Sequence, residues 1–202
     1  MRDELVFYTN PRSRGRIVRW MLEEVSVPYQ TEILEYGTTM KAPGYLAINP
    51  MGKVPTIRHG AEVVTECAAI CAYLADTYPE AKLAPPVGDR AKYYRWLFFA
   101  AGPLEAAVIN ASLGFVVPGE REVTAGYGTL ANTLDALESA VSGNPYIAGE
   151  TFSAADVYVG SQISWGLQFG TIKTRDSFEM YARRVIDRDA YRRTNDIDGP
   201  MS

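Results

Sequence analysis

The chain has 202 residues with a formal net charge of −4 at pH 7, and hydrophobic residues make up 47% of it. This net negative charge argues against nucleic acid as a partner, because binding of the phosphate backbone requires clustered Lys and Arg. No apolar run approaches the roughly 18 residues of a membrane span, and the charged, then strand-like start lacks the long apolar region of a secretory signal. We therefore expect a cytoplasmic protein with no nucleic-acid and no membrane partner.

Cysteine and histidine are scarce. Cys67 and Cys71 are the two cysteines, and they lie four residues apart in a segment with helical spacing, where a disulfide would be strained. His59 is the single histidine, so no set of metal ligands accompanies the thiols. We expect neither a disulfide scaffold nor a metal site.

The first part of the chain predicts alternating strands and helices. Residues 5–9 form a short apolar run that ends in Asn10-Pro11, which indicates a strand and a turn. From Arg16 apolar residues recur at helical spacing until Pro28 ends the element. Residues 29–34 alternate and predict a second strand.

A hairpin and a helix follow. A loop over residues 49–54 enters a strand, and a turn at His59-Gly60 leads back into a partner strand over residues 62–64. Residues 65–78 then have the spacing of a helix, which Pro79 ends. This order of elements predicts a mixed sheet with helices packed against it.

The composition changes at residues 84–88, where two prolines and a glycine cannot continue a helix. We expect an α/β domain over residues 1–80, a linker over 81–88 and an all-α helical bundle over 89–202. The polar tail from Thr194 to Ser202 is expected to fray. The helices predicted for the second domain cover residues 89–116, 121–142, 154–170 and 176–193.

Two clusters of arginine occur along the chain. The first lies in the segment where the first helix begins, and the second lies near the end, where Asp187 and Asp189 are interleaved with it. We interpret the second cluster as a solvated helix face. The clusters are Arg12, Arg14, Arg16 and Arg19, and Arg183, Arg184, Arg188, Arg192 and Arg193.

Three local patterns concern backbone groups. Pro55 enters a strand without an N–H donor and so belongs at an edge or a bulge; X–Pro bonds are cis in only about 5–6% of cases, so the residues alone favour a plain edge proline. Thr65 is expected to cap the next helix, whose first N–H groups would otherwise suit an anion. Ser153 and Asp156 form a second capping pair, which we interpret as structural.

Taken together, these pieces resemble the cytosolic glutathione S-transferase family, in its bacterial, theta- and beta-like branches. The strongest matches are residues 49–55, Asn-Pro-Met-Gly-Lys-Val-Pro, and residues 146–156, which resemble the family's "ytGetfSlAD" motif. The resemblance covers nearly the whole chain. It implies a thioredoxin-like first domain that binds glutathione as co-substrate, an all-helical second domain, a homodimer, and conjugation of the glutathione thiolate to small hydrophobic electrophiles.

The resemblance also implies binding residues. Val54, before the family's cis-proline at Pro55, would pair through its backbone with the cysteinyl part of glutathione. Glu66 would accept a hydrogen bond from the γ-glutamyl amino group. Cys67 stands where the family usually has serine, and its thiol is a weaker donor to the γ-glutamyl carboxylate. The candidates for the glycine carboxylate, chosen by charge, are Lys41 and Lys53.

For activation of the sulfur, the resemblance offers two hydroxyls. Ser13 aligns with the serine of theta-like and the cysteine of beta-like enzymes, whereas Tyr8 aligns with the tyrosine of the tyrosine-type enzymes. Each also has a structural explanation, Ser13 as a helix cap and Tyr8 as a strand aromatic. We favour Ser13, because the Ser-Arg-Gly-Arg loop resembles the bacterial enzymes. Asn10, Arg12 or Arg14 would equally support a thiolate.

The electrophile would lie between the two domains, near aromatic residues of the second. Aromatic residues at helical spacing belong more often to a core, so none is assigned individually. Two alternatives stay open: a glutathione-dependent disulfide or peroxide reductase, for which Cys67 is a hint, and a non-catalytic glutathione-binding or regulatory protein. The aromatic residues are Tyr93, Tyr94, Trp96, Phe98, Phe99, Trp165 and Phe169.

Overall fold

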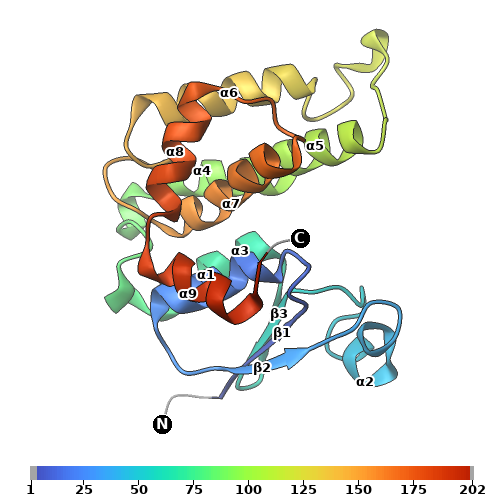
Figure 1. Ribbon diagram of the computed structural model, residues 1–202, viewed down its shortest axis with the longest axis vertical. Helices are drawn as coiled ribbons and strands as arrows, with labels where there is room; N and C mark the ends of the chain where they lie inside the picture. The colour runs from blue at the N-terminus through green and yellow to red at the C-terminus, as the bar shows by residue number, and fades with distance from the viewer. Residues whose placement is uncertain (1–3, 201–202) are drawn as a thin grey trace. The chain divides into compact units, whose positions relative to one another are not determined.

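The computed structural model describes residues 4–200 and divides them into two compact units (Figure 1). Residues 84–187 form the second unit, and the residues before and after them form the first. The helix that follows residue 187 therefore groups with the first unit, whereas the sequence placed it in the helical domain. Residues 201–202 of the predicted tail lie outside the described residues.

A mixed sheet of four strands forms the centre of the first unit, in the order β2-β1-β3-β4. Strand β1 pairs in parallel with β2 and antiparallel with β3, which pairs antiparallel with β4. The predicted mixed sheet with helices against it is confirmed. The elements are β1 (Leu5–Thr9), α1 (Gly15–Val25), β2 (Gln30–Ile33), η1 (Thr39–Lys41), α2 (Pro43–Leu46), β3 (Thr56–His59), β4 (Glu62–Thr65), α3 (Cys67–Thr77), η2 (Pro79–Ala81) and α9 (Asp189–Asp198).

Strand β1 separates two layers of helix. Phe7 is fully buried under α1, where the guanidinium carbon of Arg19 lies 5.1 Å from its ring centroid. The ring of Tyr8 lies instead 5.5 Å from the ring of Tyr45 in α2. Successive side chains of a strand point to opposite faces, so α1 and α2 cover opposite faces of the sheet (Figure 1).

Helix α9 packs along α1, with the rings of Trp20 and Tyr191 at a centroid distance of 4.8 Å. Ion pairs join the two helices along their length. The side chains of Arg19, Asp198 and Glu24 in these pairs are buried. The resulting interface explains why α9 belongs to the first unit. The pairs are Arg188 with Glu24 at 2.6 Å, Arg193 with Glu23 at 2.8 Å, and Arg19 with Asp198 at 3.2 Å.

Two expectations about the end of the chain are wrong. Arg188 is half-buried and Arg193, although exposed, is not free in solvent, because each pairs with a glutamate of α1. The tail does not fray from Thr194 onward, because α9 continues to Asp198 and Thr194 is buried. Packing against α1 supplies the apolar contacts and ion pairs that a polar segment lacks by itself.

The second unit is helical, as predicted, although the helices differ from the prediction in three places. Pro103 lacks an N–H group, and the chain forms a π turn around it where one helix was expected over residues 89–116. The next helix begins at Leu130 instead of 121, and α8 ends at Ile186. The elements are η3 (Val87–Asp89), α4 (Ala91–Phe99), η4 (Ala100–Leu104), α5 (Glu105–Ser112), η5 (Gly119–Arg121), α6 (Leu130–Gly143), α7 (Ala154–Phe169) and α8 (Asp176–Ile186).

The capping pair at the start of α7 is confirmed. Asp156 is fully buried, and its carboxylate accepts hydrogen bonds from Ser153 N–H and Oγ, each at 2.9 Å, from Ile147 N–H at 2.7 Å and from Tyr181 Oη at 2.8 Å. Burial raises the pKa of Asp156, and the hydrogen bonds oppose that rise. One carboxylate thus joins the start of α7, the preceding loop and α8.

Substituting Asp156 with alanine should destabilise the second unit by about 3–5 kcal/mol, because four buried donors lose their acceptor. Urea unfolding followed by circular dichroism measures the change. The matched control is Asp135→Ala, which removes an exposed carboxylate of α6 that pairs with Arg175 and should cost about 1 kcal/mol or less. Equal losses in the two variants would contradict the role assigned to Asp156.

Candidate functional site

The loop between β1 and α1 holds Ser13 at the start of the helix. The half-buried Ser13 Oγ donates to the carbonyl oxygen of Asn10 at 2.6 Å and accepts from the N–H of Gly15 at 2.9 Å. Asn10 is buried, donates through Nδ2 to the carbonyl oxygen of Leu34, and accepts from the N–H of Arg12 through Oδ1. The loop is thus fixed by its own polar groups. Ser13 precedes the N-cap residue Arg14 and accepts from the first N–H of α1.

The electrostatic field at this loop favours an anion. Helix α1 has no acidic residue in its first turn, and Arg12 and Arg14 are exposed beside Ser13. The N-terminus of a helix carries a partial positive charge, which adds to that of the arginines. Both effects lower the pKa of a thiol placed at Ser13.

The start of α3 lies against the same loop. Cys67 Sγ donates to the carbonyl oxygen of Arg14 at 3.5 Å, and the Cys67 side chain is buried. This contact joins the N-terminus of α3 to the N-terminus of α1. Two positive helix ends therefore converge within one short region of the first unit.

The helix cap at α3 differs from the prediction. Thr65 stays in β4, and the exposed Glu66 is the N-cap residue, with φ of 66° and no capping hydrogen bond from its side chain. A positive φ in a residue other than glycine costs about 1–3 kcal/mol and occurs preferentially at functional sites. The first turn of α3 is thus left without a side-chain cap, and the Glu66 carboxylate projects from an exposed position.

The Val54–Pro55 peptide bond is cis, as the resemblance implies and in contrast to the plain edge proline favoured by the residues alone. Within residues 4–200, the backbone N–H and C=O groups of Val54 make no hydrogen bond. The preceding residue is held firmly, because the Lys53 carbonyl oxygen accepts from Tyr45 Oη and from Asn49 Nδ2. Val54 therefore presents an unpaired edge of backbone beside an anchored loop.

Both candidate lysines are exposed and lie on this loop wall. Lys41, at the end of η1, donates through Nζ to the carbonyl oxygen of Met51 at 3.0 Å. Tyr8 adjoins the same wall, since its ring packs on Tyr45, whose hydroxyl contacts the Lys53 carbonyl. The two candidate hydroxyls thus come from adjoining segments, Tyr8 from the α2 face of β1 and Ser13 from the start of α1.

No group of three or more His, Cys, Asp or Glu side chains in residues 4–200 is arranged to hold a metal ion. In the same range, no helix has the length and apolar character needed to cross a membrane.

Comparison with known proteins identifies the family. The model of the glutathione S-transferase N-terminal domain matches residues 13–77, and that of the C-terminal domain matches residues 120–165. Glutathione S-transferase GST-4.5 of Xanthomonas campestris pv. campestris is 26% identical over 196 residues, which cover 90% of this chain and 93% of that protein. The chain belongs to the glutathione S-transferase family.

Solved glutathione S-transferases have the same fold. The glutathione transferase of Methylococcus capsulatus is 26% identical with a TM-score of 0.80, and the match covers 96% of this chain and 98% of that one. A sphingomonad glutathione S-transferase, complexed with glutathione, is also 26% identical, with a TM-score of 0.78 and the same coverage. The expected thioredoxin-like first part and helical second part are confirmed.

Two neighbours of the Ser13 loop in this glutathione S-transferase have structural roles that the sequence patterns did not indicate. Arg16 was assigned to a basic cluster, yet it is 4% exposed and hydrogen-bonded. Gly15 received no role, yet a Cβ atom at this position would overlap Thr9 Oγ1. The available signal was the spacing of Arg16 and Arg19, which places both guanidinium groups on one face of a helix.

Replacing Gly15 with alanine should destabilise the protein by about 1–3 kcal/mol, because the new methyl group overlaps the Thr9 hydroxyl. Thr9 Oγ1 is buried without a hydrogen-bond partner among the described residues, so Thr9→Ala alone should cost little. In the double variant the overlap with Thr9 Oγ1 is removed, while contacts of 3.0 Å to Ser13 Oγ and 3.1 Å to Thr9 Cβ stay, so part of the loss should be recovered. Unfolding free energies of the four proteins give the coupling. Additive losses would rule out the overlap as the cause.

Proposed function

We propose that this glutathione S-transferase binds glutathione with its first unit and transfers the thiolate sulfur to a small hydrophobic electrophile. The observation that carries the proposal is the contact of Cys67 Sγ with the Arg14 carbonyl, which joins two helix N-termini next to Ser13. The γ-glutamyl-cysteinyl part of glutathione has two anionic groups, a carboxylate and a thiolate. Each of them would be stabilised by the positive N-terminus of a helix. The family relationship supports the same activity.

Each part of glutathione has a complementary group in this arrangement. The unpaired backbone of Val54, next to Pro55, would bind the cysteinyl amide groups as a short strand does. The γ-glutamyl carboxylate would accept from the first turn of α3 at Cys67, with its amino group on Glu66. The lysines proposed for the glycine carboxylate are Lys41 and Lys53.

The sulfur would be activated by Ser13. The hydroxyl now donates to the Asn10 carbonyl, and rotation about its C–O bond would turn the same proton toward the glutathione sulfur. The thiol proton leaves to solvent, the sulfur lone pair forms the bond to the electrophilic carbon, and either a leaving group departs or a neighbouring atom takes up a proton. Each unit by which the thiol pKa falls from about 8.5 corresponds to about 1.4 kcal/mol of stabilisation of the thiolate.

Among the aromatic residues of the second unit, Phe98 and Phe169 are 71% and 54% exposed and are candidates for contact with an apolar molecule, whereas Tyr93 and Trp96 are buried in the core of the unit. We further propose that the glutathione-binding domain consists of residues 1–80 with α9, that the protein forms a homodimer, and that it acts in the cytoplasm.

The two cysteines give a reductase little support. Cys67 is 8% exposed and Cys71 is fully buried, and burial raises the pKa of the Cys71 thiol well above its ordinary value. A thiol that resists ionisation is a poor nucleophile toward a disulfide or a peroxide. Transfer to an electrophile is therefore the function we propose.

The test combines retention on glutathione-agarose with turnover of an aryl halide. Ser13→Ala should lower kcat/KM by about 100-fold or more, the cost of one lost donor to a developing or stabilised anion, and should leave retention unchanged. Tyr8→Phe should stay within about threefold of the wild type, an effect of at most about 0.7 kcal/mol. No retention and no turnover would refute the function, whereas loss in Tyr8→Phe alone would assign activation to Tyr8.

A second prediction concerns the unusual thiol. Cys67→Ser should tighten glutathione binding by about fivefold, since a hydroxyl is a better donor to the γ-glutamyl carboxylate and a neutral hydrogen bond contributes about 1 kcal/mol. Titration calorimetry measures the Kd, and Cys67→Ala serves as the control that keeps the backbone N–H alone. If the serine variant binds no tighter than the alanine variant, this side chain does not contact the ligand.

A further inference from the structure

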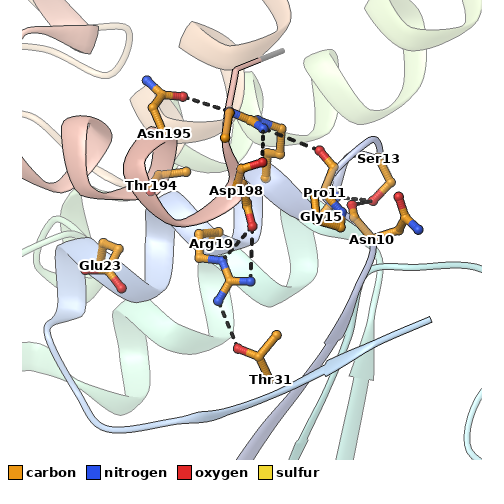
Figure 2. Close-up of polar contacts among 12 residues, drawn as sticks. Asn10, Pro11, Ser13, Gly15, Arg19, Glu23, Thr31, Thr194, Asn195 and Asp198 are labelled. Atoms are coloured by element: carbon orange, nitrogen blue, oxygen red, sulfur yellow. Dashed lines mark hydrogen bonds and ion pairs between the residues drawn. The ribbon is translucent and has the colours of Figure 1, made fainter. Parts of the chain in front are cut away.

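The buried guanidinium of Arg16 joins the Ser13 loop to the end of α9. One Nη atom donates to Asn195 Oδ1 at 2.9 Å and to the Gly199 carbonyl at 2.8 Å. The other donates to the carbonyl oxygens of Asp198 at 3.3 Å and Pro11 at 3.4 Å. Figure 2 labels three residues that accept these bonds, Asn195, Asp198 and Pro11, and marks the contacts with dashed lines.

The chemistry of the four acceptors explains why an arginine lies here. Each acceptor is a carbonyl or amide oxygen, and Asp198 and Gly199 are the last residue and the C-cap of α9. The final carbonyls of a helix lack partners within it and carry a partial negative charge, which a cation stabilises. The planar, five-donor guanidinium of Arg16 serves acceptors in several directions, which a lysine ammonium does not reproduce.

A second arginine fixes the same end of α9. Arg19 pairs with Asp198 Oδ1 at 3.2 Å, and the two side chains are 3% and 2% exposed. Arg19 also donates to Tyr29 Oη at 3.1 Å and to Thr31 Oγ1 at 2.9 Å, so the pair is tied to β2. The C-terminal end of α9 is thus held in a buried polar network and forms a rigid support for Arg16.

The contact with Pro11 carries this support to the catalytic loop. The Pro11 carbonyl follows directly after the Asn10 carbonyl, which accepts the hydrogen bond of Ser13 Oγ at 2.6 Å. Arg16 donates to the turn at Pro11, while the Asn10 side chain donates from the turn to the Leu34 carbonyl oxygen. Arg16 thus contacts the residue next to the carbonyl that accepts from the Ser13 hydroxyl.

We propose that α9 is a positioning element of the active site, which acts through Arg16 to orient Ser13 toward the sulfur of bound glutathione. The inference rests on the proposed function. Arg16 is a positioning residue in this scheme and does not contact the substrate. The other charged or titratable groups around the loop are Arg12 and Arg14 within it, Tyr36 with its hydroxyl 3.4 Å from the Arg12 carbonyl, Cys67 of α3, and Asp198 of α9 on the far side of Arg16.

The test measures the ionisation of enzyme-bound glutathione from the ultraviolet absorbance of the thiolate as a function of pH. Arg16→Met should raise the apparent pKa of the bound thiol by about one unit, a tenfold loss of thiolate at low pH, and should lower kcat accordingly. The Kd for glutathione should change by less than about threefold, about 0.6 kcal/mol, because Val54 and α3 are untouched. Arg16→Lys keeps the charge and loses the planar set of donors, so it should raise the apparent pKa of the bound thiol as Arg16→Met does.

The matched control is Arg188→Met, which breaks the pair with Glu24 at the other end of the same helix interface. It should lower the unfolding midpoint and leave the apparent pKa of the bound thiol unchanged. If Arg16→Met does not fold, Asn195→Ala removes one acceptor of Arg16 without altering α1 and should raise the apparent pKa of the bound thiol in the same direction. An unchanged pKa in the variants at Arg16 and Asn195, or an equal rise in Arg188→Met, would overturn the inference.

The wild-type titration separates this inference from the proposed function. A wild-type protein that binds glutathione only as the thiol, or not at all, would refute the proposed function and the inference with it. A wild-type protein that ionises glutathione, together with unaffected variants, would refute the positioning role alone.

Discussion

The charge pattern of α1 against that of α9 is the interaction on which the first unit depends. Helix α1 carries Arg16 and Arg19 near its start and Glu23 and Glu24 near its end, an order that opposes its own macrodipole. The pattern is favourable only because an antiparallel helix with the complementary order lies beside it, with Arg188 and Arg193 early and Asp198 late. The unfavourable interaction of these charges with the α1 macrodipole is thus offset by their ion pairs with α9.

The same arrangement serves the proposed chemistry. Arginines at the start of α1 add to the positive field of a helix N-terminus, and α9 keeps Arg16 from reaching into the site by occupying its donors. In the proposed scheme, the field that favours a thiolate acts through the helix terminus, Arg12 and Arg14, and the Ser13 hydroxyl is the proposed short-range donor. Cys67 supplies the contact that brings α3 to this region, in a position where the family usually has serine.

Local sequence patterns predicted much of this structure. The strands, the helix that begins near Arg16 and the capping pair of Ser153 and Asp156 depend on neighbouring residues, and each was found where the sequence indicated. The candidate binding groups at Val54 and Glu66 came from a family resemblance, and the exposed carboxylate and unpaired backbone are compatible with it. Their contact with glutathione remains a prediction.

The features that the sequence did not predict depend on distant contacts or on competition between local preferences. Nothing near Arg188 indicates a glutamate on α1, which is more than 160 positions earlier in the chain. The apolar spacing around Pro103 predicted one continuous helix. The chain instead forms a π turn there, because the helical spacing competes with the missing N–H of the proline. Thr65 was expected to cap α3, but pairing with Thr56 across the hairpin keeps it in β4.

The grouping of α9 with the sheet makes the first unit a discontinuous domain, into which residues 84–187 are inserted. During synthesis, the sheet and α1 emerge well before the helix that completes their polar network. Until then, the guanidinium groups of Arg16 and Arg19 lack their acceptors in α9, and the surface of α1 that will be covered faces water or other proteins. The unit that contains the sheet therefore reaches its final structure only after the helical unit has been made.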